Sequence, residues 1–259
     1  MSREGVAELQ RVTENGWRSG VSNLMRAAFG SWWRTSTWWI QSLVWTAVIN
    51  GSLATVIWGE TPDDLSAFSL FGVMTMFSAI AVTIVMQEAI VGEKRSGTAA
   101  WVLSKPASRT AFMLSKLVPN AIGAIATMIA IPSLVLLLQF TVAGIEVSIG
   151  RFALGAAVAA LNLLFYLTLT LMLGTLFDTA SPVIAVPLAF AFGQQLLGSA
   201  VTTFLPWSLL VPLEGSDVSV IGAIIAGVPV SSYRAIVVTG FACVTFTIVA
   251  FGKWARTEL

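Results

Sequence analysis

Few side chains in this chain could perform covalent chemistry. It has no histidine and a single cysteine, Cys243, which lies within an apolar run. The lack of histidine excludes serine–histidine relays, zinc-protease motifs and histidine metal sites, and one cysteine cannot form a disulfide within the chain. No convincing pair of aspartates and no serine–lysine dyad lies in an apolar run either. We therefore expect no enzymatic activity and no metal site in this chain.

The densest polar segment of the chain runs from Glu88 to Lys116. Within it, Gly97 can end one helical turn and free the backbone, and Pro106 can stop a short helix that begins after the glycine. The segment should therefore form a compact knob with a basic rim. Its basic residues could also belong to a solvated loop that only sets the topology of the chain.

The chain has no phosphate-binding loop of its own. Its one Gly-Lys pair, Gly252-Lys253, is followed by Trp254 and lacks the spacing of the nucleotide-binding motif. Any ATP that drives this protein must therefore be bound by another chain. The net charge of +1 gives no reason to expect a nucleic-acid partner.

Composition indicates a membrane protein, because 56% of the residues are hydrophobic and only 10% are charged, against roughly 25% in soluble domains. A membrane helix needs about 20 apolar residues. Six uncharged runs have about that length, which predicts an all-α, polytopic membrane protein with six transmembrane helices in one domain, residues 1–259. The predicted spans are Trp38–Trp58, Ser66–Met86, Leu117–Phe140, Phe152–Phe177, Val183–Phe204 and Ala235–Phe251.

The orientation follows from the basic residues, which concentrate on the cytoplasmic side of membrane proteins. If both ends and residues 92–116 face the cytoplasm, 12 of the 14 basic residues lie inside. Residues 59–65, 141–151 and 205–234 then face out. An apolar stretch at Val218–Val230 is too short to cross comfortably, and we expect an external short helix or a re-entrant turn there.

Ahead of the first span, residues 22–36 should form an amphipathic helix. Leu24, Ala28 and Trp32 recur at four-residue steps, with Arg26 and Arg34 on the other side. Tryptophans beside arginines suit a helix in the inner headgroup layer. We expect either a plain membrane anchor or an elbow that guides the first span, with cytoplasmic tails at residues 1–21 and 252–259.

The segment after the second predicted span resembles a known family, the type-2 ABC transporter permeases. These proteins carry a loop of the form Glu-basic-basic-x-Gly-Thr, then Leu-Ser-x-Pro-x-Ser-Arg, then Lys. The matching positions are Glu93, Lys94, Arg95, Gly97, Thr98, Leu103, Ser104, Pro106, Ser108, Arg109 and Lys116.

The resemblance implies a permease subunit of an ATP-driven exporter in a bacterial cytoplasmic (inner) membrane. It implies that this loop is a coupling helix, in contact with a separate ABC ATPase subunit that binds ATP and Mg²⁺. It also implies pairing with a second permease copy or a related permease. The residues that would contact the ATPase are Glu93, Lys94, Arg95, Gly97, Thr98, Leu103, Ser104, Pro106 and Arg109.

A substrate pathway would need uncharged polar groups within the spans. The predicted fifth span carries a polar strip around Gln194 and Gln195, and paired glutamines in lipid need partners or water. Interhelical hydrogen bonding explains the same residues. The pathway candidates are Asn50, Thr75, Ser78, Gln194, Gln195 and Ser199.

Two other readings remain open. A proton-coupled secondary transporter would act without an ATPase, although such carriers usually keep a charged residue inside a span and none is placed there. A non-transporting membrane scaffold would bind an ATPase without moving a solute. The chemical nature of the substrate is open in every case.

Overall fold

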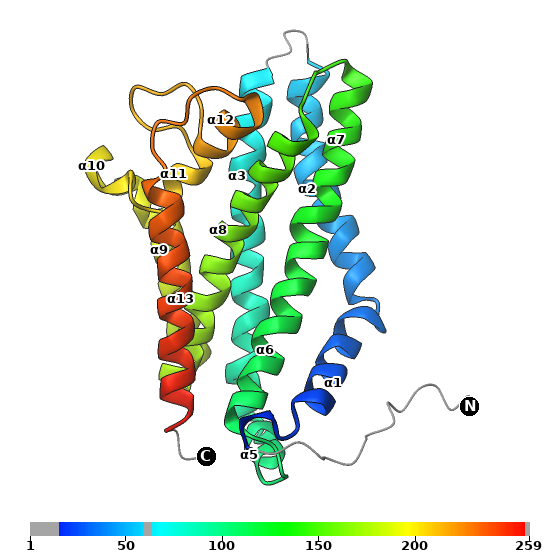
Figure 1. Ribbon diagram of the computed structural model, residues 1–259, viewed down its shortest axis with the longest axis vertical. Coiled ribbons are helices and arrows are strands. Elements are labelled where there is room, and N and C mark those ends of the chain that lie inside the picture. The colour runs from blue at the N-terminus through cyan, green and yellow to red at the C-terminus, as the bar shows by residue number, and fades with distance from the viewer. Residues whose placement is uncertain (1–15, 60–63, 257–259) are drawn as a thin grey trace.

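The computed structural model describes residues 16–59 and 64–256, and these form helices without any strand (Figure 1). Predictions for residues 1–15, 60–63 and 257–259 fall outside the described residues. Five helical stretches are long and apolar enough to cross a membrane, which supports a membrane protein. They are α2 (Thr37–Ile57), α3 with its extension (Asp64–Arg95), α6 to α7 (Arg109–Ala143), α8 (Ile149–Leu176) and α13 (Arg234–Trp254).

Two of these stretches contain wide π-helical turns. α3 (Asp64–Gln87) passes through η2 (Glu88–Gly92) into α4 (Glu93–Arg95), and α6 (Arg109–Ala124) passes through η3 (Ile125–Ala130) into α7 (Ile131–Ala143). A π turn inserts one residue into the helical repeat and shifts the faces that follow it. In α3 the shift comes where the polar segment begins.

The prediction of a continuous helix across Val183–Phe204 is wrong in its second half. α9 (Ala180–Gly193) is followed by one 3₁₀ turn, η4 (Gln194–Leu196), after which Leu197 and Gly198 are extended. The chain then forms only α10 (Ser199–Thr202) and α11 (Trp207–Leu210). A helix of 14 residues is about 21 Å long, short of a hydrocarbon core of about 30 Å. Composition alone could not show this break because the residues beyond it are also uncharged.

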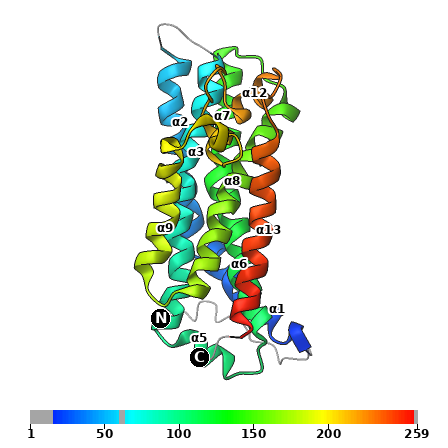
Figure 2. The same cartoon turned by 90° about the vertical axis from the view of Figure 1, so that its left-hand side faces the viewer.

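The elements form a bundle with two distinct ends (Figure 1). One end carries α1 (Val21–Trp33), α5 (Thr98–Leu103) and the last turn of α13, and the other carries α12 (Val220–Ala226). α2, the α6–α7 rod and α9 run away from the α5 end, and α3, α8 and α13 run back toward it (Figure 2). The chain thus alternates in direction, with α9 as the short element.

α8 is the centre of the packing and contacts both α3 and α13. Small residues allow the close approach: a Cβ at Gly155 would lie 2.6 Å from Ile225 of α12, and one at Gly174 would lie 3.0 Å from Ile90. Of the most apolar part of α8, 67% is buried inside the chain, against 17% for α13. α13 therefore offers most of its surface to lipid or to another chain.

A helix is present ahead of α2, but it ends at Trp33, three residues earlier than expected. The Trp32 side chain is buried against Gly123 of α6, and its indole Nε1 donates to Asn120 Oδ1 at 2.9 Å. This part of α1 therefore packs on the protein.

The stretch at Val218–Val230 contains one short helix, α12, and no long one. Ser219 caps the N-terminus of α12 through its side chain, which accepts from the Gly222 N–H at 3.1 Å, and Gly227 ends the helix with φ of 75°. α12 packs on α3 and α8 at the end opposite α5. Its seven residues are too few to span a bilayer.

Candidate functional site

The polar segment after α3 builds a small knob at one end of the bundle (Figure 1). Gly97 has φ of 74°, a conformation that favours glycine, and it separates α4 from α5. α5 ends at Leu103, and the chain turns at Pro106 before Ser108 caps α6 by accepting from the Ala111 N–H at 2.9 Å. The predicted short helix between the glycine and the proline is therefore present.

The surface of the knob is apolar and basic. Trp101 on α5 is 64% exposed, and the ammonium of Lys105 lies 5.2 Å from the centre of its ring. Thr98, Ser104 and Pro106 are also exposed. A tryptophan exposed on a short helix is the kind of side chain that anchors protein interfaces.

The base of the knob is tied to the bundle by two charged residues that had been expected to face a partner. Glu93 forms an ion pair with Lys116 of α6. The ammonium of Lys94 lies 3.1 Å from Asp178 Oδ1 and 3.4 Å from the carbonyl oxygens of Thr175 and Phe177 at the end of α8. Both side chains therefore position the knob rather than form its outer surface.

The end of α13 is joined to the same region. Arg109 donates from Nη1 to the carbonyl oxygen of Ala255 at 2.8 Å. The rings of Phe112 and Trp254 stack with centroids 5.1 Å apart, and Lys94 lies 5.7 Å from the Trp254 ring. Trp254 is buried although it is the last residue of α13. These contacts would transmit a displacement of the knob to the end of α13.

A third attachment comes from the segment ahead of α1. The Ser108 N–H donates to the Ser19 carbonyl at 2.9 Å, and the Ser108 hydroxyl donates to the Trp17 carbonyl. Gly20 has φ of 79° and approaches so closely that a Cβ there would lie 3.0 Å from the Cβ of Ala107. The exit of the knob is therefore held against α1 as well.

Of the nine predicted contact residues, five are exposed on the knob and four are not. Arg95, Gly97, Thr98, Ser104 and Pro106 are exposed. The other four are partly buried, and they are Glu93, Lys94, Leu103 and Arg109. Sequence reasoning left out Trp101 and Lys105, although an apolar ring and a cation in a loop bounded by glycine and proline were the available signals.

The pathway candidates of the first two spans are buried inside the chain. Asn50 Nδ2 donates to the Pro132 carbonyl at 3.1 Å, and the Thr75 hydroxyl donates to the Gly72 carbonyl at 2.6 Å. The Ser78 hydroxyl and Asn50 Oδ1 have no hydrogen-bond partner among the described residues. Asn50 and Thr75 thus serve contacts between or within helices.

We expected the remaining candidates to form a polar strip on one face of the fifth span, and they do not. The broken helix separates them. Gln194 is buried, and its Nε2 donates to the Tyr166 hydroxyl at 3.0 Å while its Oε1 accepts from the Trp207 N–H at 3.1 Å. Gln195 and Ser199 are exposed. Gln194 therefore links α8, η4 and α11, and of these three candidates only Gln195 and Ser199 remain accessible.

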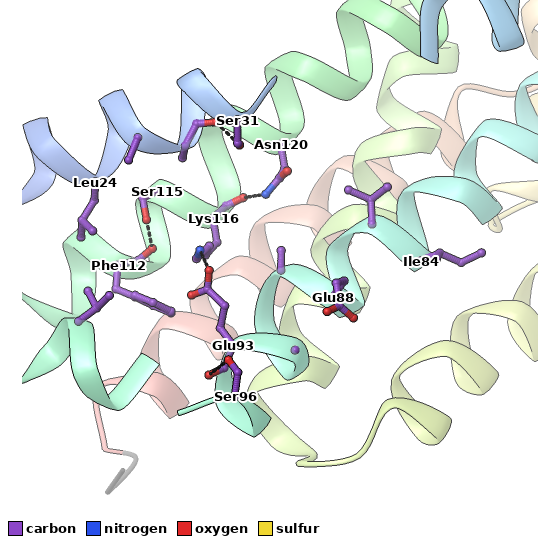
Figure 3. A pocket seen from close by; sticks show the side chains of 16 residues that line it. Leu24, Ser31, Ile84, Glu88, Glu93, Ser96, Phe112, Ser115, Lys116 and Asn120 are labelled. Atoms are coloured by element: carbon purple, nitrogen blue, oxygen red, sulfur yellow. Dashed lines mark hydrogen bonds and ion pairs between the residues drawn. The ribbon is translucent and has the colours of Figure 1, made fainter. Parts of the chain in front are cut away.

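A cleft of about 800 Å³ lies behind the knob, between α1, α3 and α6 (Figure 3). Its walls are largely apolar, and its charged residues are Glu88, Glu93 and Lys116. Among the described residues, no group of three or more His, Cys, Asp or Glu side chains is placed to hold a metal ion.

Comparison with known proteins gives one family. A family model described as "Protein of unknown function (DUF2705)" matches residues 40–253. This range includes the five long apolar stretches almost completely, the knob and α12. No curated protein matches the chain.

Proposed function

The chain belongs to this DUF2705 family, and we propose that it is the membrane-spanning permease subunit of an ATP-driven exporter. The proposal extends to separate ABC ATPase subunits, which would bind ATP and Mg²⁺ and dock on the knob. It also extends to two permeases, either two copies or one copy with a related chain, that together form the pathway in a bacterial cytoplasmic membrane.

The observation that carries the proposal is the exposed Trp101 on a short helix that is anchored on three sides. α5 is attached at its entrance to α8 through Lys94, and at its exit to α13 through Arg109 and to the segment before α1 through Ser108. A loop that only set the topology would need basic residues but no such anchors. Anchoring is useful if a force that acts on the exposed helix has to reach the spans.

These attachments support a mechanism in which the knob moves the spans. When two ATPase subunits close on ATP, a helix seated in a groove of one subunit moves with it. α4 and α6 would then transmit the displacement directly, and Lys94 and Arg109 would carry it to the ends of α8 and α13. A change in the angle of α8 and α13 against α3 would open or close the pathway between the two permeases.

The six-span layout with both ends in the cytoplasm is part of this proposal. The alternating direction of the helices supports it, because α9 together with residues 194–210 runs from the α5 end toward the α12 end (Figure 2). The excess of basic residues on the α5 side supports the orientation. Gln195 and Ser199, which are exposed, are the pathway candidates that fit best, since the others make contacts inside the chain or are buried.

The test compares two tryptophans with similar exposure at opposite ends of the bundle. Trp101 on α5 is 64% exposed, and Trp58 at the end of α2 is 56% exposed. We expect Trp101→Ala to lose the copurifying ABC ATPase and the ATP hydrolysis of the reconstituted complex, while Trp58→Ala keeps both. A tryptophan that is a hot spot of an interface costs about 2 kcal/mol or more when it is truncated, roughly a thirtyfold loss of affinity.

Three outcomes would count against the proposal. ATPase association that is unchanged in Trp101→Ala would remove the docking assignment. Transport that follows the proton gradient without an ATPase would favour a secondary transporter. An ATPase that binds the wild-type chain but supports no transport would favour a membrane scaffold.

A further inference from the structure

We propose that the cleft between α1, α3 and α6 binds an amphipathic amine, a molecule with one apolar chain and one cationic nitrogen, with the nitrogen on Glu88. This inference does not depend on the exporter function. It rests on the shape of the cleft, on its charges and on the place of Glu88 in the bundle.

The cleft has room for such a molecule and suitable walls. Its volume is about 800 Å³, and Leu24 and Ala28 of α1 line it together with Ile84 and Val85 of α3. Figure 3 shows these two helices with α6 between them, and Glu88 lies one helical turn beyond Ile84. An alkyl chain on these walls is removed from water, which stabilises binding by about 0.8 kcal/mol per buried CH₂.

The charges of the cleft leave one carboxylate without a partner. Lys116 is paired with Glu93, so these two charges compensate each other. Glu88 makes no ion pair and accepts no hydrogen bond within the described part of the chain, and no dashed line reaches it in Figure 3. The lining therefore carries a net negative charge that a cation would neutralise.

Glu88 is exposed, and the local backbone leaves room for its carboxylate. Glu88 and Gly92 are the first and last residues of the π-helical turn, and a Cβ at Gly92 would overlap the Glu88 carboxylate. The glycine thus provides the space into which the carboxylate folds. π turns of this kind are frequent at functional sites.

The same charges favour a single-chain amine over a phospholipid. A zwitterionic headgroup would need a cation for its phosphate as well as Glu88 for its ammonium. The one lysine of the cleft is already paired with Glu93. Ile84, which is 53% exposed, leaves the cleft open along α3, so an amphiphile dissolved in the adjacent leaflet can enter sideways.

The experiment uses the full-length protein in phosphatidylcholine nanodiscs and two probes of equal chain length, dodecylamine and dodecanol. We expect the amine to bind more tightly than the alcohol. Glu88→Gln should weaken amine binding about tenfold, in line with a charged hydrogen bond, and leave alcohol binding unchanged. Glu214→Gln, at an exposed carboxylate outside the cleft, is the matched control and should change neither.

A second variant tests the position of the chain. Ala28→Phe fills the cleft from the α1 side without touching Glu88 and should abolish binding of both probes. Amine binding that is unchanged in Glu88→Gln, or in Ala28→Phe, would overturn the proposal. Displacement of the amine by an equimolar amount of phosphatidylethanolamine would also overturn it, because the occupant would then be a phospholipid.

Discussion

The ammonium of Lys94 lies 3.1 Å from the carboxylate of Asp178, which joins the base of the knob to the residues that follow α8. Lys94 also reaches the carbonyl oxygens of Thr175 and Phe177 at 3.4 Å. These are C-terminal carbonyls of a long helix, where a cation is favourable because the helix dipole leaves partial negative charge. One side chain therefore caps α8 and fixes the place where α4 meets the bundle.

This relationship predicts different roles for two lysines of the same segment. The Lys94 side chain is 7% exposed and makes three polar contacts, whereas Lys105 is exposed on the knob. Lys94→Met should lower the free energy of unfolding by about 1–2 kcal/mol, and Lys105→Met should change it by less than about 0.5 kcal/mol. Thermal unfolding in detergent measures both, and equal effects would contradict the capping role.

Gly97 offers a test of the knob's shape that leaves every charge in place. A Cβ at this position would meet nothing within 4 Å, so the effect of Gly97→Val would come only from its φ of 74°. A β-branched residue in this region is strained by about 1–2 kcal/mol or more. We expect ATPase association to fall while membrane insertion stays normal.

The control for Gly97→Val is Gly150→Val, at another glycine whose Cβ would meet nothing within 4 Å but whose φ is not in the left-handed region. Normal ATPase binding in Gly97→Val would mean that the shape of the turn is not needed for docking.

Leucine substitutions at the two adjacent glutamines should have different effects on stability and on transport. Gln194→Leu removes the bond to the Tyr166 hydroxyl and leaves the Trp207 N–H without its acceptor. An unsatisfied buried donor costs about 1–3 kcal/mol, so this variant should unfold at lower temperature. Gln195→Leu, at an exposed position, should keep wild-type stability and change only the transport of a substrate. If Gln194→Leu instead changed transport at wild-type stability, Gln194 would again be a candidate for the pathway.

Gly123 should be required for the attachment of α1. A Cβ there would overlap the Trp32 ring, and the Trp32 Nε1–Asn120 bond would be lost as the ring moved away. We expect Gly123→Ala to increase the rate at which trypsin cleaves at Arg26 and Arg34. Gly51→Ala is the control, because its Cβ would meet nothing within 4 Å. Equal cleavage in both variants would show that α1 is held by other contacts.

The orientation of the bundle is tested by single cysteines on a Cys243→Ser background. Ser104→Cys on the knob should be labelled by a membrane-impermeant maleimide only after the cells are permeabilised, and Ser216→Cys near α12 should be labelled in intact cells. The basic residues near the α5 end give this expectation. Labelling of Ser104→Cys in intact cells would show that the knob faces outward and that the predicted orientation is wrong.

Five of the six predicted spans correspond to long apolar helices, because an uncharged run of about 20 residues is a property of composition. The short helix between Gly97 and Pro106 also followed from local chemistry, since a glycine with positive φ and a proline in a polar segment both favour the end of a helix. Such features depend on neighbours in the chain, and the sequence was sufficient for them.

The tertiary structure decided which polar side chains turn inward. Glu93 and Lys94 belong to a segment that reads as a basic rim, yet their partners, Lys116 and Asp178, lie 23 and 84 residues further along the chain. Gln194 reads as part of a polar strip, yet its hydrogen bonds to Tyr166 and Trp207 accompany the end of α9. The sequence alone determined where apolar helices and turns can form, because hydropathy and backbone preference are local. Only the packing of distant elements decided which charges hold the knob in place and which surface remains for a partner, because a buried polar group has to find its counterpart in space.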